Sequence, residues 1–68
     1  MDEFRCYLKK YRQWHNMTQE DLADKVGVRR ETIMRLEQGR YNPSLKLALK
    51  ISKAVDTPID QLFEFDDI

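Results

Sequence analysis

The sequence predicts an all-α domain built from five short helices, and three observations support this fold class. Apolar residues recur at intervals of three and four along most of the chain. No segment alternates apolar and polar residues with the period of two that is typical of a strand. The two glycines and two prolines lie between the periodic stretches, where they end or begin helices. A length of 68 residues allows a single domain, residues 1–68.

The first helix is predicted over residues 2–15. No glycine or proline interrupts this stretch, and its apolar side chains share one helix face: Phe4, Leu8 and Tyr11. Trp14 and His15 stand near its end, where we expect them to pack or half-pack against the domain. Cys6 is the one cysteine, so we expect a buried or partly buried thiol without an internal disulfide.

The second and third helices are predicted as a closely joined pair. Thr18 and Asp21 have the spacing of a capping box, which marks the start of the second helix. Gly27 ends that helix, because glycine tolerates the positive φ of a tight turn. The third helix begins at about Arg29 and ends before Gly39. The inward faces of the pair are expected at Leu22, Ala23, Val26, Ile33 and Leu36.

The fourth and fifth helices follow a loop that ends at Pro43. Ser44 is placed to cap the fourth helix, whose inward stripe is expected to consist of Leu45, Ala48, Ile51, Ser52 and Val55. Thr57 is expected to cap a short fifth helix with Pro58 in its first position, where a missing amide hydrogen costs nothing. The inward residues of this last helix are expected to be Ile59, Leu62 and Phe63.

Charge is unevenly distributed along the chain, although the formal net charge is zero. Between residues 29 and 53, seven basic side chains stand against two acidic ones. From residue 54 onward there are five acidic side chains and no basic one, and the chain closes with an acidic tail at residues 64–68. This segregation favours one basic face for a polyanion, although a solvated mixture of surface charges remains an alternative on charge alone.

The composition gives no indication of an enzyme, a metal protein or a membrane protein. One histidine and one cysteine provide neither a metal-ligand set nor a nucleophile and base. No apolar run approaches the roughly 20 residues of a membrane span, and Met1 is followed by charged residues rather than by a signal peptide. We therefore expect a cytoplasmic protein with no cofactor, no membrane partner and no small-molecule ligand.

The predicted pair of helices has the features of a helix-turn-helix at about residues 18–38. Ala23 is small enough for two helices to approach closely, and Gly27 permits the sharp turn. The segment MTQEDLADKVGVRRETIMRLEQGRYNPS resembles the helix-turn-helix of lambda-type phage Cro and repressor proteins, the XRE family. PSLKLALKISKAV and IDQLF resemble the last two helices of that five-helix domain. The resemblance implies a lambda repressor-like domain that binds double-stranded DNA.

The resemblance implies that the third helix lies in the major groove. Because Ile33 and Leu36 face inward, the residues expected to contact bases are Arg29, Arg30, Glu31, Met34 and Arg35. Arg30 and Arg35 are the first choices, because a guanidinium can bond guanine O6 and N7 together. Three of the five have alternative roles. Arg29 could instead bind a phosphate, Glu31 could orient a neighbouring arginine, and Met34 could fill a gap in the packing.

Contacts to DNA phosphates are expected on both sides of that helix. The resemblance implies that Gln19 contacts a phosphate and braces the third helix, with Thr18 beside it, and free helix amides favour an anion there. The other residues expected to contact phosphates are Thr32, Gln38, Arg40, Tyr41, Asn42, Ser44 and Lys46. For Thr32 packing remains an alternative, and Lys50 and Lys53 are expected on a solvated helix face.

Two further roles follow from the resemblance. Arg12 and Glu37 match an arginine and a glutamate that pair in this family and tie the first helix to the third. Family members usually associate through their last helices, so we expect a homodimer that buries Leu49, Phe65 and Ile68, with a frayed acidic tail as the alternative.

The sequence thus predicts a dimeric transcriptional regulator, a repressor by default, on an inverted repeat with half-site centres about 10 base pairs apart. Antitoxins and restriction-system controller proteins resemble this type as well. The alternative from another class is a protein-interaction module that would use Leu47, Leu49 and the acidic tail. The basic surplus coincides with the helix proposed to enter the groove, which favours DNA.

Overall fold

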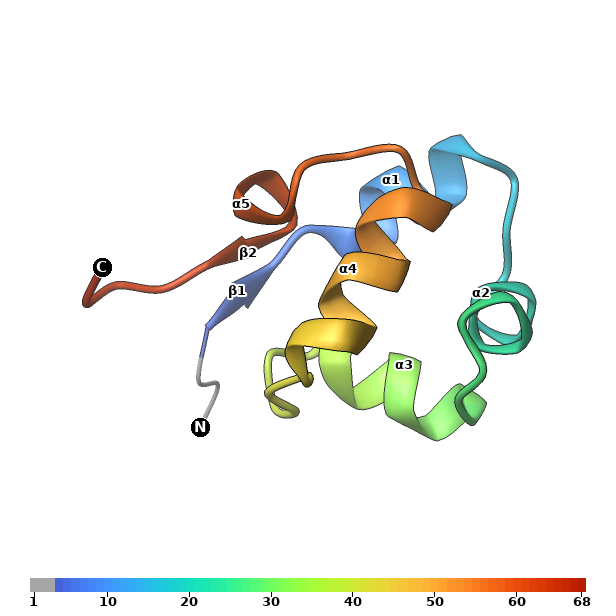
Figure 1. The fold of residues 1–68 in the computed structure, drawn as a ribbon, viewed down its shortest axis with the longest axis horizontal. Coiled ribbons are helices and arrows are strands. Elements are labelled where there is room, and N and C mark those ends of the chain that lie inside the picture. Colours follow the sequence, from blue (N-terminus) through green and yellow to red (C-terminus); the bar gives the residue numbers. More distant parts are fainter. Residues whose placement is uncertain (1–3) are drawn as a thin grey trace.

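The computed structural model describes residues 4–68. Five helices and two short strands follow one another as β1 (Arg5–Cys6), α1 (Leu8–Trp14), α2 (Gln19–Val26), α3 (Arg30–Glu37), α4 (Leu45–Ala54), α5 (Ile59–Leu62) and β2 (Phe63–Glu64). Figure 1 shows α4 crossing in front of α1 and α3. The helix α2 lies at one end of the long axis, and the two strands and the C-terminus lie at the opposite end (Figure 1).

The core lies where the five helices meet. Its fully buried large side chains come from every helix or its end, namely Leu8, Leu22, Ile33, Leu36, Ile51, Val55 and Leu62. The apolar faces predicted for the second and third helices are therefore confirmed. Within residues 4–68 no helix combines the length and the apolar character needed to cross a membrane.

The predicted helix boundaries around α2, α3 and α4 are also confirmed. The amide of Asp21 donates to Thr18 Oγ1 over 3.0 Å, and the amide of Thr18 donates to Asp21 Oδ2 over 2.9 Å. Gly27 ends α2 with a φ of 78°, in the left-handed region that favours glycine. Ser44 caps α4, because its hydroxyl oxygen accepts the Leu47 amide over 3.1 Å.

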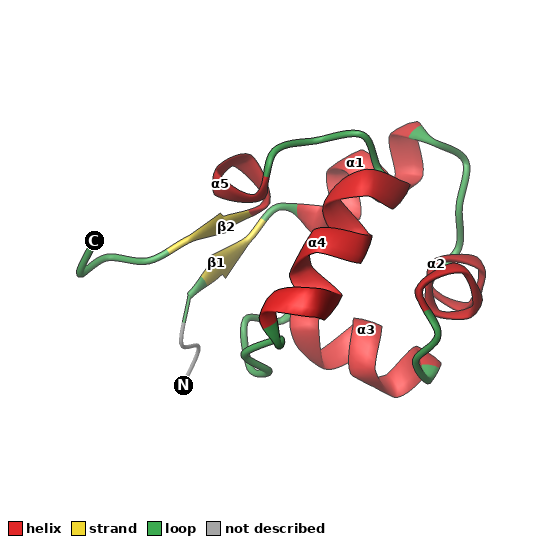
Figure 2. Ribbon diagram, viewed as in Figure 1, coloured by secondary structure: helices red, strands yellow, loops and turns green. Residues whose placement is uncertain are grey.

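The expectation of an uninterrupted helix over residues 2–15 is wrong. Residues 2 and 3 lie outside the described part of the chain, and residues 5 and 6 form β1, which pairs antiparallel with β2 (Figure 2). The ring of Phe4 packs on Phe63 and Phe65, with centroids 5.7 and 5.1 Å apart. The amide of Tyr7 donates to the Leu62 carbonyl over 2.8 Å. These partners lie at the other end of the sequence, so they override the local helical pattern.

The predicted inward stripe of α4 is shifted. Leu45 is 74% exposed, whereas Leu47 is 7% exposed and belongs to the core. Residues four apart line up along a helix, so Leu47, Ile51 and Val55 form the row that faces the core. Leu47 is therefore not an exposed residue that an interaction module could use.

Two smaller expectations are also corrected. The fifth helix is capped by Pro58 rather than by Thr57, which is buried and donates its hydroxyl to the Val55 carbonyl over 2.8 Å. Phe63 is buried as expected, but it lies in β2. Trp14 is 74% exposed and His15 is exposed, because α1 ends beyond the core.

The thiol of Cys6 is half-buried and has no disulfide partner, as the sequence predicts. Burial raises the pKa of Cys6 to about 11, so the thiol stays protonated at neutral pH.

Candidate nucleic-acid interface

The turn between α2 and α3 sets the angle of the third helix. The amides of Gly27 and Val28 both donate to the Ala23 carbonyl, over 2.9 and 3.0 Å, and close the end of α2. No atom lies within 4 Å of a Cβ built on Gly27, so glycine is required there for its positive φ rather than for lack of space. The chain then enters α3 from Arg29, whose backbone is extended.

The helix α3 buries one side and presents the other to solvent. Ile33 and Leu36 are fully buried, and they anchor the helix to the core. Four of the five residues expected to contact bases are exposed, and the fifth, Met34, is half-buried; the exposed four are Arg29, Arg30, Glu31 and Arg35. The structure therefore brings these five residues together along one short helix and the residue that precedes it.

A buried ion pair lies beneath this helix. Arg12 of α1 donates from Nε to Glu37 Oε2 over 2.7 Å and from Nη2 to Glu37 Oε1 over 3.2 Å. Both side chains are 7% exposed. Arg12 Nη1 also donates to the Met17 carbonyl over 2.8 Å, so this guanidinium holds the loop before α2 as well as α3. The pair joins the first helix to the third, as the resemblance implies.

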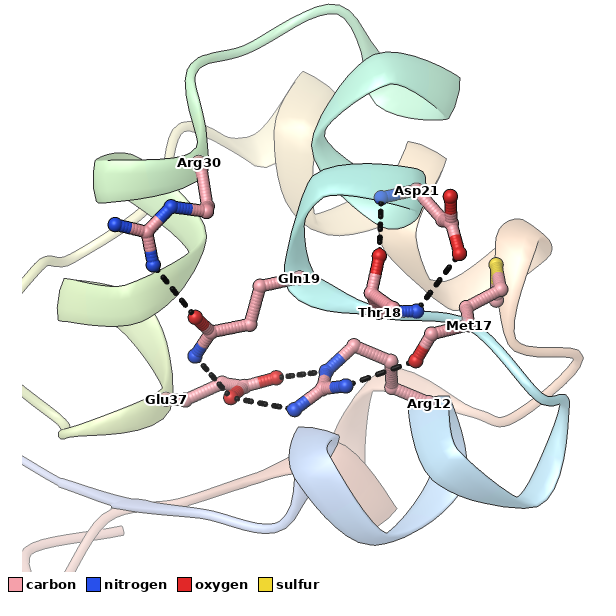
Figure 3. A network of polar contacts seen from close by, with 7 residues as sticks. All are labelled: Arg12, Met17, Thr18, Gln19, Asp21, Arg30 and Glu37. Carbon is pink, nitrogen blue, oxygen red and sulfur yellow. Dashed lines mark hydrogen bonds and ion pairs between the residues drawn. The ribbon is translucent and has the colours of Figure 1, made fainter.

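Gln19 extends this pair to the surface (Figure 3). Its Nε2 donates to Glu37 Oε1 over 3.0 Å, and its Oε1 accepts Arg30 Nη1 over 3.2 Å. An ionised carboxylate only accepts hydrogen bonds, so Glu37 determines which side of the amide faces it. The oxygen of Gln19 is thereby turned toward Arg30. We call this row of hydrogen-bonded side chains the Gln19 relay; it consists of Arg12, Glu37, Gln19 and Arg30.

The Gln19 relay is the feature that sequence reasoning missed. The resemblance implies a bracing role for Gln19, but not its simultaneous bonds to Glu37 and Arg30, because spacing along the chain does not reveal which side-chain atoms meet. Glu31 is one candidate for orienting an arginine, yet within residues 4–68 no ion pair involves it. Arg30 is instead oriented by Gln19.

Apart from Thr32, which lies within α3, the residues expected to contact phosphates lie before and after this helix in the chain. Thr18 and Gln19 stand at the start of α2, where Thr18 is exposed and Gln19 is half-buried. On the other side, the end of α3, the loop after it and the first turn of α4 carry the exposed residues Gln38, Arg40, Tyr41, Asn42, Ser44 and Lys46. Thr32 is half-buried, which agrees with packing as well as with an outward contact.

Two of the residues expected in a dimer interface, Phe65 and Ile68, line an apolar groove. The groove, of about 560 Å³, lies between the start of α4, α5 and the strands, and its apolar lining includes Phe4, Leu45, Ala48, Ile59, Phe63, Phe65 and Ile68. Ile68 is fully exposed, Leu49 is 47% exposed, and Phe65 is half-buried against Phe4. Leu45 is a residue that the predicted stripe had wrongly assigned to the core.

Comparisons with known proteins agree with this geometry. The family model described as Helix-turn-helix matches residues 8–62. An uncharacterized HTH-type transcriptional regulator of Archaeoglobus fulgidus is 56% identical over 63 residues, which cover 93% of this chain and 89% of the relative.

Solved structures share the fold. The restriction-modification controller protein C.AhdI from Aeromonas hydrophila is 34% identical, with a TM-score of 0.73, and the match covers 82% of this chain and 85% of that protein. The N-terminal DNA-binding domain of SinR from Bacillus subtilis is 27% identical, with a TM-score of 0.71, and covers 79% of this chain and 80% of that domain.

Proposed function

This chain belongs to the XRE family of helix-turn-helix transcriptional regulators, and from that premise we propose that it is a repressor that recognises one DNA sequence with α3. The observation that carries the proposal is the exposed side of α3, where Arg29, Arg30 and Arg35 project from a helix that Ile33 and Leu36 anchor. An exposed helix of this size and charge suits the major groove.

Within this proposal the residues divide into two groups. Arg30 and Arg35 bond guanine, Met34 contacts a thymine methyl group, and Arg29 and Glu31 complete the base-contacting group. The second group binds phosphates and fixes the position of the protein without reading sequence; it consists of Thr18, Gln19, Thr32, Gln38, Arg40, Tyr41, Asn42, Ser44 and Lys46. The Gln19 relay supports the proposed role of Arg30, because it holds the guanidinium on the exposed side of α3.

We further propose that the protein binds an inverted repeat as a homodimer. The apolar groove and the exposed side chains of Leu49 and Ile68 support this, because their burial in a second copy would remove apolar surface from water. Two-fold symmetry then places half-site centres about 10 base pairs apart. The binding of a dimer would block the promoter, which is the mode of action that we propose.

Selection of bound fragments from random duplex DNA tests this function. We expect one enriched motif with two-fold symmetry, and an affinity for it that falls steeply with salt because phosphate contacts release counterions. Fragments without a common motif would show that the protein does not read sequence. An affinity independent of salt would show that the basic side of the domain does not face DNA.

A further inference from the structure

A groove with an apolar floor and a lysine rim lies between the end of α2 and the outer side of α4. It consists of two adjoining hollows of about 290 and 190 Å³, and both are lined by Val26 and Lys50. Val26 and Leu47 are buried at the floor. Four exposed lysines surround them, namely Lys25, Lys46, Lys50 and Lys53. We call this surface the lysine groove.

The charges of the lysine groove are not compensated. In the part of the chain from Phe4 to Ile68, none of the ion pairs within 4.0 Å involves one of these four lysines. Lys46 belongs to the residues proposed to bind phosphate, but Lys25, Lys50 and Lys53 have no part in the proposed function. Several ammonium groups around one hollow repel one another, so an anionic partner is favoured there.

The chain carries a second set of charges that the proposed function does not use. Asp66 and Asp67 are exposed, and they are followed by Ile68, whose side chain is fully exposed. Asp66 contacts Arg5, but the two side chains are 82% and 56% exposed, and exposed ion pairs contribute little stability. The tail is therefore available to another partner.

The tail does not line the lysine groove of its own chain. Figure 1 shows the C-terminus at one end of the long axis and α2 at the other, and the molecule is 31 Å long. Three residues span about 10 Å when fully extended. A second copy can bring its tail to the groove without a change of conformation in the helices of either chain.

We propose that the lysine groove binds residues 66–68 of a second copy of this chain. The aspartates then lie against Lys50 and Lys53, and the side chain of Ile68 covers Val26 and Ala54 at the floor. The two contacting surfaces differ, so the contact is heterologous and can repeat from copy to copy. It involves none of the base-contacting residues. Ile68 then leaves the apolar groove, whose other lining residues and Leu49 stay available to the two-fold dimer. This inference is independent of the proposed function, because the contact forms without DNA.

Sedimentation of the full chain at low salt tests the contact. We expect the wild-type chain to form species larger than a dimer. The variants K50E/K53E and D66K/D67K should each weaken this association about tenfold, since each replaces attraction by repulsion at two positions. An equimolar mixture of the two variants restores opposite charges and should associate as the wild type does. The matched control is K9E, a change of an exposed lysine on α1, which should have no effect.

A synthetic peptide with the sequence of residues 63–68, FEFDDI, keeps the test valid if a variant does not fold. The peptide should compete with self-association of the wild-type chain. A wild-type chain that never exceeds a dimer, or a mixture of variants that does not associate, would overturn the proposal. Loss of affinity of K50E/K53E for a single operator would instead assign these lysines to phosphate binding and would also overturn it.

Discussion

Beneath the helix-turn-helix, Arg12 joins α1 to α3 through Glu37, while at the strands Arg5 joins β1 to β2 and the tail through Glu64 and Asp66. The side chains of the first pair are 7% exposed, and those of the second set are 52 to 82% exposed. Water screens the exposed pairs and leaves the buried one almost unscreened. We therefore expect removal of a partner to cost much stability in the buried pair and little in the exposed set.

The comparison predicts its largest effect at Glu37. Changing Glu37 to Ala leaves the Arg12 guanidinium buried without a carboxylate, so we expect the free energy of unfolding to fall by about 3–5 kcal/mol. Urea denaturation measures this. The matched control is Glu64→Ala, which removes a carboxylate from the exposed set and should cost less than about 1 kcal/mol. Equal losses in the two variants would show that burial does not distinguish these pairs.

The strands should depend on their aromatic rings rather than on their charges. Phe4 is 5% exposed and packs against two other rings, so Phe4→Ala should lower the free energy of unfolding by about 3 kcal/mol. Arg5→Ala in the neighbouring position should cost less than about 1 kcal/mol. Thermal unfolding of the two variants checks this, and a larger loss for Arg5→Ala would contradict it.

A third prediction separates stability from DNA recognition. Arg35 is exposed, so Arg35→Ala should leave unfolding unchanged but reduce discrimination between the selected operator and random DNA by about 1–3 kcal/mol. Arg40→Ala should weaken binding to both DNAs nearly alike. Gln19→Ala removes a proposed phosphate contact and also releases Arg30, so it should weaken binding to both DNAs and reduce discrimination as well. Titration of each variant with both DNAs measures the difference. A uniform loss for Arg35→Ala would assign that residue to phosphate binding.

The smallest effect is expected at the cap of α2, which is exposed like the strand ion pairs. Hydrogen bonds from the backbone amide and the side chain of Thr18 lower the pKa of Asp21 below its usual 3.8. The stabilisation is therefore present above the unfolded-state pKa and is lost as the pH falls through the lower folded-state value. Asp21→Asn should make the stability less dependent on pH below about 4, as acid titration of unfolding would show. An unchanged acid profile would mean that Thr18 does not stabilise the ionised carboxylate.

The ends of α2 and the start of α4 could be predicted from the sequence, because their signals are local. Thr18, Gly27 and Ser44 act on residues at most a few positions away, so their spacing was sufficient to place the helix ends. The strands could not be predicted, because each has two residues and Arg5 pairs with Glu64 at the other end of the chain. The position of Leu45 was missed for another reason. At the start of α4, spacings of three and four fit a stripe that begins at Leu45 and another that begins at Leu47. Only the packing of the folded chain decides which of the two is buried.

The sequence indicated which residues make up the candidate site, but not the hydrogen bonds that link their side chains. The outward side of α3 follows from Ile33 and Leu36, and Arg12 and Glu37 follow from the family resemblance. The bonds that link Gln19 to both Glu37 and Arg30 depend on three side-chain conformations, which no spacing rule supplies.

A side-chain amide donates hydrogen bonds from its NH₂ group and accepts them at its oxygen, so the Gln19 amide has two possible orientations 180° apart. The buried carboxylate of Glu37 selects the orientation in which the NH₂ group faces it. The buried Glu37 thus determines that Gln19 offers an acceptor, and not a donor, to the exposed Arg30 guanidinium. A glutamate in place of Gln19 would put a second negative group against Glu37, with almost no change in side-chain volume.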